Sequence, residues 1–192
     1  AYEIDKGLIT LLSKRFEKKN VNFINKDFLS VDLSEINDSS LIIMGNLPYN
    51  ISSQIILNIL EADIEYEHCI FLIQKELAQR FCPKTKSSKI SIIAEFFCDF
   101  EILFDIPPEA FYPEPKVTSS LAKIRKHSRF NDRKESFIAL KRILSLCFAN
   151  PRKKISNPLK NIFNIMPRFS FDMNSRPEEL VIQDYFEILS KY

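Results

Sequence analysis

The sequence has little of several residue types that many enzymes need. It contains only two glycines, Gly7 and Gly45, so these 192 residues include no glycine-rich phosphate-binding loop. Its four cysteines form no C-x-x-C pair, and only His68 and His127 could join them as ligands, so we expect buried, reduced thiols and no metal site. No apolar run approaches the roughly 18 residues that span a bilayer, and the first residues lack a signal-peptide pattern. The sequence therefore predicts a soluble, intracellular protein.

Composition and charge indicate a globular protein with one basic part. Hydrophobic residues make up 45% of the chain and charged residues 27%, which is typical of a chain with a core of its own. Residues 1–122 contain 12 Lys or Arg and 18 Asp or Glu, whereas residues 123–192 contain 15 and 7. This excess of positive charge predicts contacts with phosphate, as in nucleic acid. A basic face that is merely solvated is the alternative.

The hydrophobic pattern divides the chain into two domains, 1–126 and 127–192. In the first, apolar runs alternate with amphipathic segments, which predicts strand-helix-strand units around a mostly parallel sheet. The predicted strands are 1–4, 22–25, 41–44, 69–73, 99–104 and 118–125, and the predicted helices are 5–19, 52–62, 74–81 and 89–97. Asp5 and Ser52 are good N-cap residues. A polar linker at 127–132 leads to a small all-α domain with predicted helices 133–148, 155–163 and 177–189.

Glu3 suggests where a nucleotide would bind. In nucleotide-binding α/β folds, the acidic residue that binds the ribose ends a strand about 20 residues after the glycine-rich loop. Glu3 ends the first apolar run and has this position. We therefore expect the loop to precede residue 1, and the absence of an initiator Met agrees with this expectation.

The tetrapeptide Asn46-Leu47-Pro48-Tyr49 follows an apolar run and precedes a predicted helix. It thus lies at the carboxyl end of a strand, where open α/β sheets bind ligands. The exocyclic amine of adenine is a poor nucleophile because its lone pair is delocalised into the ring. Acceptors such as the Asn46 side-chain oxygen and the Leu47 carbonyl could draw the nitrogen out of conjugation, while Pro48 fixes the turn and Tyr49 offers a face to an unstacked base. The alternative is a helix-entry turn with a packed tyrosine.

Further segments accompany this motif in a fixed order. They are Glu3-Ile4-Asp5, Asp27-Phe28, Asn50-Ile51-Ser52, Gln74-Lys75-Glu76, Ala78-Gln79-Arg80, Ala110-Phe111-Tyr112-Pro113-Glu114-Pro115-Lys116-Val117 with Ser119, and Arg176-Pro177-Glu178-Glu179-Leu180. With these segments, which cover almost the whole chain, the sequence resembles the ribosomal RNA adenine dimethyltransferase family. That family is related to the erythromycin-resistance methyltransferases.

The resemblance implies a Rossmann-like, S-adenosylmethionine-dependent methyltransferase sheet, here without its first strand, followed by the small helical domain. It implies that Asn46, Leu47 and Pro48 present the target amine, and that Tyr49 and Phe111 enclose the flipped base. Taken alone, Phe111 could be a core aromatic residue.

The same resemblance implies a set of cofactor-binding and RNA-binding residues. Glu3 would bind the ribose of S-adenosylmethionine next to Ile4. Asp27 would bind its adenine beside Phe28, and Asn46 would also contact the cofactor, although Asp27 could be only a turn residue. The RNA-binding residues would be Lys116, Arg152, Lys153 and Lys154. Pro151 departs from the family pattern, because a basic residue is common at its position.

The function implied is dimethylation of the exocyclic amines of adjacent adenosines in small-subunit ribosomal RNA, with a role in biogenesis of that subunit. We expect a cytoplasmic monomer without metal or membrane, and we expect a chain of only these residues to be inactive because the cofactor loop is absent. One alternative is an assembly factor that acts mainly by binding RNA. A second is a resistance-type enzyme for large-subunit RNA, although Leu47 and residues 176–180 favour the small subunit. A DNA adenine methyltransferase is disfavoured, because those usually have Asp at the position of Asn46.

Overall fold

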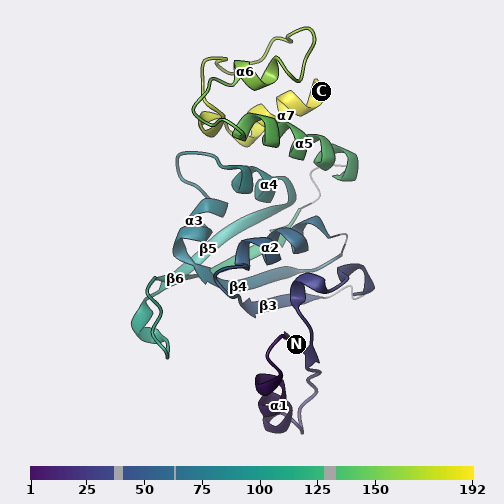
Figure 1. Cartoon of the computed structure of the whole chain (residues 1–192), viewed down its shortest axis with the longest axis vertical. Coiled ribbons are helices and arrows are strands. Elements are labelled where there is room, and N and C mark those ends of the chain that lie inside the picture. The colour runs from purple at the N-terminus through teal and green to yellow at the C-terminus, as the bar shows by residue number, and fades with distance from the viewer. Residues whose placement is uncertain (37–40, 63, 128–132) are drawn as a thin grey trace.

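A four-stranded mixed sheet forms the centre of the molecule (Figure 1). The structure, a computed structural model, describes residues 1–36, 41–62, 64–127 and 133–192. The strand order is β3-β4-β6-β5, with bounds Ile42–Asn46 for β3, His68–Gln74 for β4, Ser119–Lys126 for β6 and Cys98–Ile106 for β5. Only the β3–β4 pair is parallel, and β6 is antiparallel to both of its neighbours. The prediction of a mostly parallel sheet is therefore wrong here, because residues 107–118 return the chain from β5 to β6 without a crossover helix.

A second, two-stranded sheet lies near the N-terminus. Strands β1 (Tyr2–Glu3) and β2 (Ile24–Asn25) are parallel and are joined through α1 (Lys6–Arg15). The predicted cap of this helix is confirmed, since the Asp5 carboxylate accepts hydrogen bonds from the backbone N–H groups of Gly7 and Leu8 at 2.7 and 3.0 Å.

Helices α2 (Ser52–Glu61), α3 (Lys75–Phe81) and α4 (Lys89–Phe97) cover one face of the main sheet (Figure 1). The alternation in β4 explains this cover, because Cys69, Phe71 and Ile73 are buried on the same face. The prediction that Ser52 caps α2 is wrong. Ser52 is the first helical residue, and its hydroxyl donates to the backbone oxygen of Tyr49 at 3.1 Å instead.

The last 60 residues of the chain are helical but less regular than the sequence predicts. Helix α5 (Arg133–Phe148) has the predicted bounds, whereas α6 (Ser156–Leu159) is shorter than the predicted 155–163. After Leu159 the backbone continues in tighter turns, in which the Asn161 N–H donates to the backbone oxygen of Pro158 at 3.0 Å. The helix predicted at 177–189 is a 3-10 turn, Pro177–Glu179, followed by α7 (Ile182–Ser190). The Asp184 carboxylate accepts from the backbone N–H of Val181 at 2.9 Å, which starts a new helix. None of the described helices is long and apolar enough to cross a membrane.

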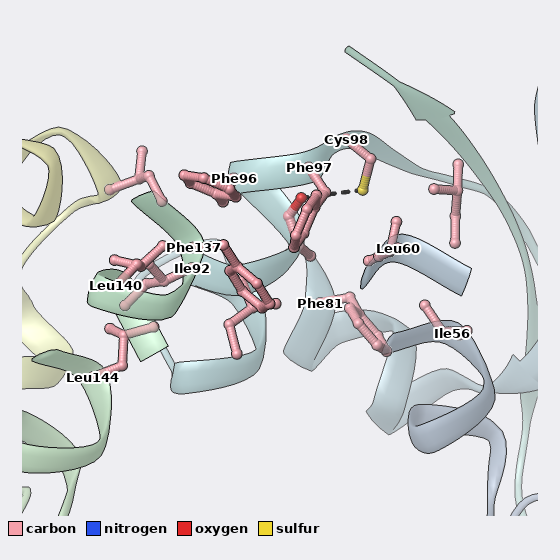
Figure 2. Packing of buried hydrophobic residues seen from close by; sticks show 14 of the residues in the cluster. Ile56, Leu60, Phe81, Ile92, Phe96, Phe97, Cys98, Phe137, Leu140 and Leu144 are labelled. Atoms are coloured by element: carbon pink, nitrogen blue, oxygen red, sulfur yellow. Dashed lines mark hydrogen bonds between the residues drawn. The ribbon is translucent and has the colours of Figure 1, made fainter. Parts of the chain in front are cut away.

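Aromatic side chains join the helical part to the sheet part. The ring of Phe96 in α4 packs against those of Phe97, Phe137 and Phe186, with centroids 5.0, 5.7 and 6.2 Å away. Phe97 and Phe137 are also in edge contact at 4.6 Å (Figure 2). The hydrophobic core is therefore continuous from α2 through α4 to α5 and α7.

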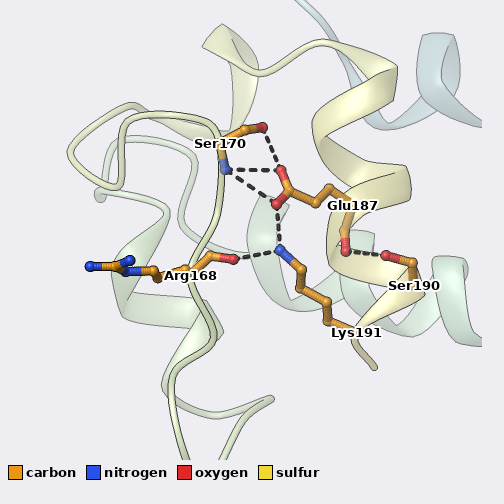
Figure 3. Close-up of polar contacts among 5 residues, drawn as sticks. All are labelled: Arg168, Ser170, Glu187, Ser190 and Lys191. Atoms are coloured by element: carbon orange, nitrogen blue, oxygen red, sulfur yellow. Dashed lines mark hydrogen bonds and ion pairs between the residues drawn. The ribbon is translucent and has the colours of Figure 1, made fainter.

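The segment before α7 is fixed to that helix by Glu187. Its carboxylate accepts hydrogen bonds from the backbone N–H and the hydroxyl of Ser170 and from the ammonium of Lys191, which also donates to the backbone oxygen of Arg168 (Figure 3). Lys191 first, and then Ser170, lower the pKa of Glu187 from 4.5 to about 2. The Arg168 guanidinium points away from this network (Figure 3).

All four cysteines are free thiols. Cys69, Cys98 and Cys147 are buried as expected, and burial raises the pKa of Cys69 and of Cys147 to about 12. Cys82 is exposed, which corrects the expectation that all four are buried.

We predict that Phe96→Ala lowers the free energy of unfolding by about 3–5 kcal/mol, because a fully buried ring leaves a cavity among three others. Urea denaturation followed by circular dichroism measures this change. Ile138→Ala, at a side chain 61% exposed in α5, is the control and should have little effect. A loss below about 1 kcal/mol for Phe96→Ala would contradict a core shared by α4 and α5.

We predict that Glu187→Gln weakens the pH dependence of stability in acid. A carboxyl group whose folded pKa is lowered stabilises the fold above its unfolded pKa of 4.5, and this contribution disappears as the pH falls to about 2. Urea denaturation between about pH 6 and pH 2 should therefore show a smaller loss of stability for the variant than for the wild type. Glu17→Gln, at an exposed position after α1, serves as the control. Equal acid sensitivity of the wild type and Glu187→Gln would show that the network does not depend on this charge.

Candidate active site

The motif turn begins where β3 ends. Asn46 is the last residue of that strand, and the backbone N–H of Leu47 donates to the backbone oxygen of Leu72 in β4 at 3.1 Å. The Leu47 side chain is buried, and Gly45 leaves space for it, since a Cβ at position 45 would lie 2.9 Å from a Leu47 methyl group. The turn is thus attached to the sheet by both its backbone and a side chain.

Two oxygen atoms of this turn are open acceptors, in the sense that no donor of the described residues bonds to them. The Asn46 side chain is exposed. Within the described ranges, neither its amide oxygen nor the Leu47 carbonyl accepts a hydrogen bond from the protein. Polar atoms at the end of a strand that are left open in this way are available to a ligand with two donor hydrogens.

The hydroxyl group of Tyr49 is anchored to another strand. It shares a hydrogen bond of 2.7 Å with the hydroxyl of Ser119, in which either oxygen can donate. Tyr49 is half-buried, whereas Ser119, the first residue of β6, is fully buried. This contact joins the motif turn to the start of β6, 70 residues later in the chain.

Phe111 lies on the connection between β5 and β6. It follows a 3-10 turn, Pro108–Ala110, and its N–H donates to the backbone oxygen of Pro108 at 3.1 Å. The side chain is half-buried, and no ring of the described residues packs against Phe111 or Tyr49. Because Ile106 pairs with Ser119 at the base of this connection, the loop that carries Phe111 ends at the residue bonded to Tyr49.

A salt bridge strengthens the base of the same loop. The Asp105 carboxylate binds the Lys75 ammonium at 2.6 Å and accepts from the Ser120 hydroxyl at 2.6 Å. The hydrogen bond from Lys75, followed by that from Ser120, holds the pKa of Asp105 below its usual value. Lys75 is the first residue of α3, directly after β4. The Asp105 carboxylate therefore connects the end of β4, the end of β5 and the start of β6.

The acidic residues predicted to bind a cofactor lie at the carboxyl ends of β1 and β2. The Glu3 carboxylate accepts from the Asp5 N–H at 3.0 Å and that of Asp27 from the Leu29 N–H at 3.0 Å, each through one oxygen. The Asn25 amide donates to the backbone oxygens of Glu3 and Ile4 at 3.0 and 2.9 Å, which ties the two strand ends together.

Apolar side chains lie next to these acids. Ile4 is 67% exposed, and Phe28 is half-buried in edge contact with Tyr2 at 5.6 Å between ring centroids. The structure therefore places Glu3, Ile4, Asp27 and Phe28 along neighbouring strand ends.

The predicted RNA-binding residues fall in two separate places. Arg152, Lys153 and Lys154 are exposed in the turn between α5 and α6, where the Lys154 ammonium donates to the Asn174 side chain at 2.8 Å. Lys116 is exposed in the loop between β5 and β6. These positions are far apart along the long axis of the molecule, so they do not form a single cluster (Figure 1).

A family model described as "Ribosomal RNA adenine dimethylase" matches residues 1–190. A relative from Aliarcobacter butzleri, named "Ribosomal RNA small subunit methyltransferase A", is 36% identical over 207 residues, which cover 100% of this chain and 76% of the relative. A protein of the same name from Coxiella burnetii is 31% identical over 197 residues, with 97% of this chain and 75% of the relative covered.

The chain belongs to the ribosomal RNA adenine dimethylase family.

Solved structures agree with this membership at the level of the fold. A dimethyladenosine transferase from Plasmodium falciparum superimposes with a TM-score of 0.78 at 20% identity, covering 99% of this chain and 80% of the other. The 23S rRNA methyltransferase ErmE gives a TM-score of 0.77 at 19% identity, with the same coverage. The predicted Rossmann-like methyltransferase fold is confirmed.

As a member of the ribosomal RNA adenine dimethylase family, the chain is an S-adenosylmethionine-dependent methyltransferase, and its residues fit part of this cofactor. Glu3 and Asp27 each engage only one carboxylate oxygen in the contacts described above, so each has a second oxygen for a donor such as a ribose hydroxyl or an adenine amine. Ile4 is 67% exposed and would offer an apolar surface to the nucleoside next to the ribose. The chemistry of these donors and acceptors therefore suits the nucleoside half of S-adenosylmethionine.

Two contacts near the motif turn could not be assigned a role from the sequence. Ser119 and Ser120 are two adjacent serines at the start of a predicted strand, but alternation alone does not show which partners they meet. In the structure, the Ser119 hydroxyl shares a hydrogen bond with Tyr49, and the Ser120 hydroxyl donates to Asp105.

Proposed function

We propose that this enzyme dimethylates the exocyclic amine of adjacent adenosines in small-subunit ribosomal RNA and contributes to biogenesis of that subunit. The observation that carries the proposal is the pair of open acceptors, the Asn46 side-chain oxygen and the Leu47 carbonyl, at the carboxyl end of β3. The relatives at 31–36% identity are named for the small subunit, whereas ErmE shares only the fold, so the small subunit is favoured over a large-subunit target.

The two acceptors would activate the amine by changing the geometry of its nitrogen. Each hydrogen of the adenine amine donates to one oxygen, which draws the nitrogen out of the plane of the ring and frees its lone pair for attack. Pro48 restricts the turn that aligns the two oxygens. Tyr49 and Phe111 would enclose the flipped base, because both rings are half-buried and neither is stacked within the described residues.

The cofactor would lie beside this turn. S-adenosylmethionine supplies an electrophilic methyl group on its sulfonium. Glu3 would accept hydrogen bonds from the ribose next to Ile4, Asp27 would accept from the adenine amine beside Phe28, and Asn46 would face both ligands. These steps use no group of a second subunit and no metal, so we infer a monomeric enzyme. Because the relatives are named for small-subunit ribosomal RNA, we infer a cytoplasmic location.

The helical domain, residues 127–192, would bind RNA through phosphate, while residues 1–126 carry the methyl transfer. Arg152, Lys153 and Lys154 are exposed and lie in one turn, and the guanidinium of Arg168 is also directed to solvent (Figure 3). Lys116 would contact RNA separately, next to the loop that carries Phe111. Contacts of this kind supply affinity without sequence preference.

We predict that Asn46→Ala in the full-length enzyme lowers kcat at least about 100-fold, because one of the two hydrogen bonds formed in the transition state is lost. Transfer of a radiolabelled methyl group to small ribosomal subunits measures this change. Asn46→Asp, which keeps an acceptor oxygen, should retain more activity than Asn46→Ala. Asn58→Ala, at an exposed asparagine of α2, is the matched control. Unchanged methylation by Asn46→Ala would remove the basis of the proposed function.

Growth separates this proposal from the assembly-factor alternative. If cells that carry Asn46→Ala lack rRNA methylation but assemble subunits and grow normally, then RNA binding matters more than catalysis.

We predict that replacing Arg152, Lys153 and Lys154 together by Ala weakens RNA binding and reduces the slope of log K against log salt concentration by roughly 2. Three cations that neutralise phosphates are lost, whereas the methyl-transfer site is unaltered. Filter binding at several salt concentrations measures the slope, and kcat at saturating RNA should stay unchanged. The same substitution of the exposed Lys14, Lys18 and Lys19 near α1 is the charge-matched control. An equal effect of both triple variants would mean that the turn after α5 has no special role.

A further inference from the structure

We propose that Ser119 is a positioning residue for methyl transfer, and that its hydroxyl sets the orientation of the Tyr49 ring relative to the loop that carries Phe111. This inference rests on the proposed function, in which the two rings enclose the target base. The juxtaposition that carries it is the 2.7 Å hydrogen bond between two side chains 70 residues apart.

Ser119 is a rigid anchor because its backbone is paired on both sides. It lies opposite Gln74 of β4 and opposite Ile106 of β5, so it occupies the interior of the sheet at its carboxyl edge. The adjacent backbone oxygen of Thr118 accepts from the Lys75 N–H at 3.0 Å, which fixes the residue before it. A hydroxyl on such a frame has little freedom to follow a moving partner.

The burial of Ser119 makes the hydrogen bond to Tyr49 important for its hydroxyl. Ser119 is fully buried, and a buried hydroxyl without a hydrogen bond is costly. The phenol oxygen of Tyr49 meets this need at 2.7 Å. The bond therefore restrains the hydroxyl end of the Tyr49 ring, while Ser52 restrains the Tyr49 backbone by donating to its oxygen at 3.1 Å.

Orientation matters because a base stacks productively on only one face of the ring. Ser119 is also the residue at which the loop that begins at Pro107 and carries Phe111 ends. The position of Ser119 therefore affects both aromatic side chains, Tyr49 through the hydrogen bond and Phe111 through the loop. A loss of this restraint should misalign the base against the Asn46 and Leu47 oxygens, which affects the transition state more than ground-state binding of RNA.

Ser91 provides a control outside the site. It is buried like Ser119, and its hydroxyl also makes hydrogen bonds, accepting from the Ser88 N–H at 2.8 Å and donating to the Ser88 backbone oxygen at 2.9 Å. Removal of either hydroxyl costs the fold a buried contact. Ser91 lies in α4, whereas Ser119 touches Tyr49, a residue assigned to the base.

The test compares Ser119→Ala, Tyr49→Phe, the double variant and Ser91→Ala in the full-length enzyme. We expect Ser119→Ala and Tyr49→Phe each to lower kcat roughly tenfold with little change in KM for RNA, the double variant to be no worse than either, and Ser91→Ala to keep wild-type kcat. Ser119→Thr, which restores a hydroxyl, should recover most of the loss. Thermal unfolding of each variant shows that the fold persists.

Three outcomes would overturn the role of Ser119: equal losses of kcat in Ser119→Ala and Ser91→Ala, additive losses in the double variant, or a rise in KM alone. If Ser119→Ala does not fold, Tyr49→Phe decides, since it removes the same bond from outside the buried strand, and a normal kcat would reject the proposal. Loss of activity in Asn46→Ala with a normal Ser119→Ala would reject this inference and leave the proposed function intact.

Discussion

The antiparallel pairing of β6 between β4 and β5 is the constraint on which the site depends. Because β6 runs against both neighbours, its first residues lie at the edge where β4 and β5 end. Lys75, Asp105 and the serines of β6 can therefore meet there, and Tyr49 reaches the same edge from the turn after β3. A wholly parallel sheet would carry the start of every strand to the opposite edge and would separate these groups.

Apolar packing extends this constraint to the helical part of the chain. Phe96 and Phe97 of α4 contact Phe137 of α5 directly, so the helices that carry the basic turn are attached to the sheet by side chains rather than by the segment between β6 and α5 alone. The position of the turn between α5 and α6, which contains Arg152, Lys153 and Lys154, relative to the motif turn thus depends on a few aromatic rings. The hydrogen bonds of Glu187 then fix the segment around Ser170 to α7.

Strong periodicity and family motifs predicted much of this arrangement from the sequence. Helix α5 and strand β4 follow from clear patterns, and Asn46 was placed correctly at a strand end. Strand direction was not predictable, because alternation is the same in parallel and antiparallel strands. The single helix predicted at 177–189 is wrong because Asp184 caps a separate helix that begins at Ile182. The predicted cap at Ser52 is wrong because its hydroxyl binds the backbone oxygen of Tyr49. The partner of Ser119 required the folded chain, since it depends on a register between distant segments.

The outer strand of the main sheet exposes apolar side chains next to the motif turn. In the order of the described strands β3 is at the edge, and Met44 and Ile42 are 72% and 46% exposed there. The free side of an edge strand is a template for backbone pairing. The motif turn therefore follows a strand to which a further strand could add, so that both its neighbours in the sheet would help to fix the position of Asn46.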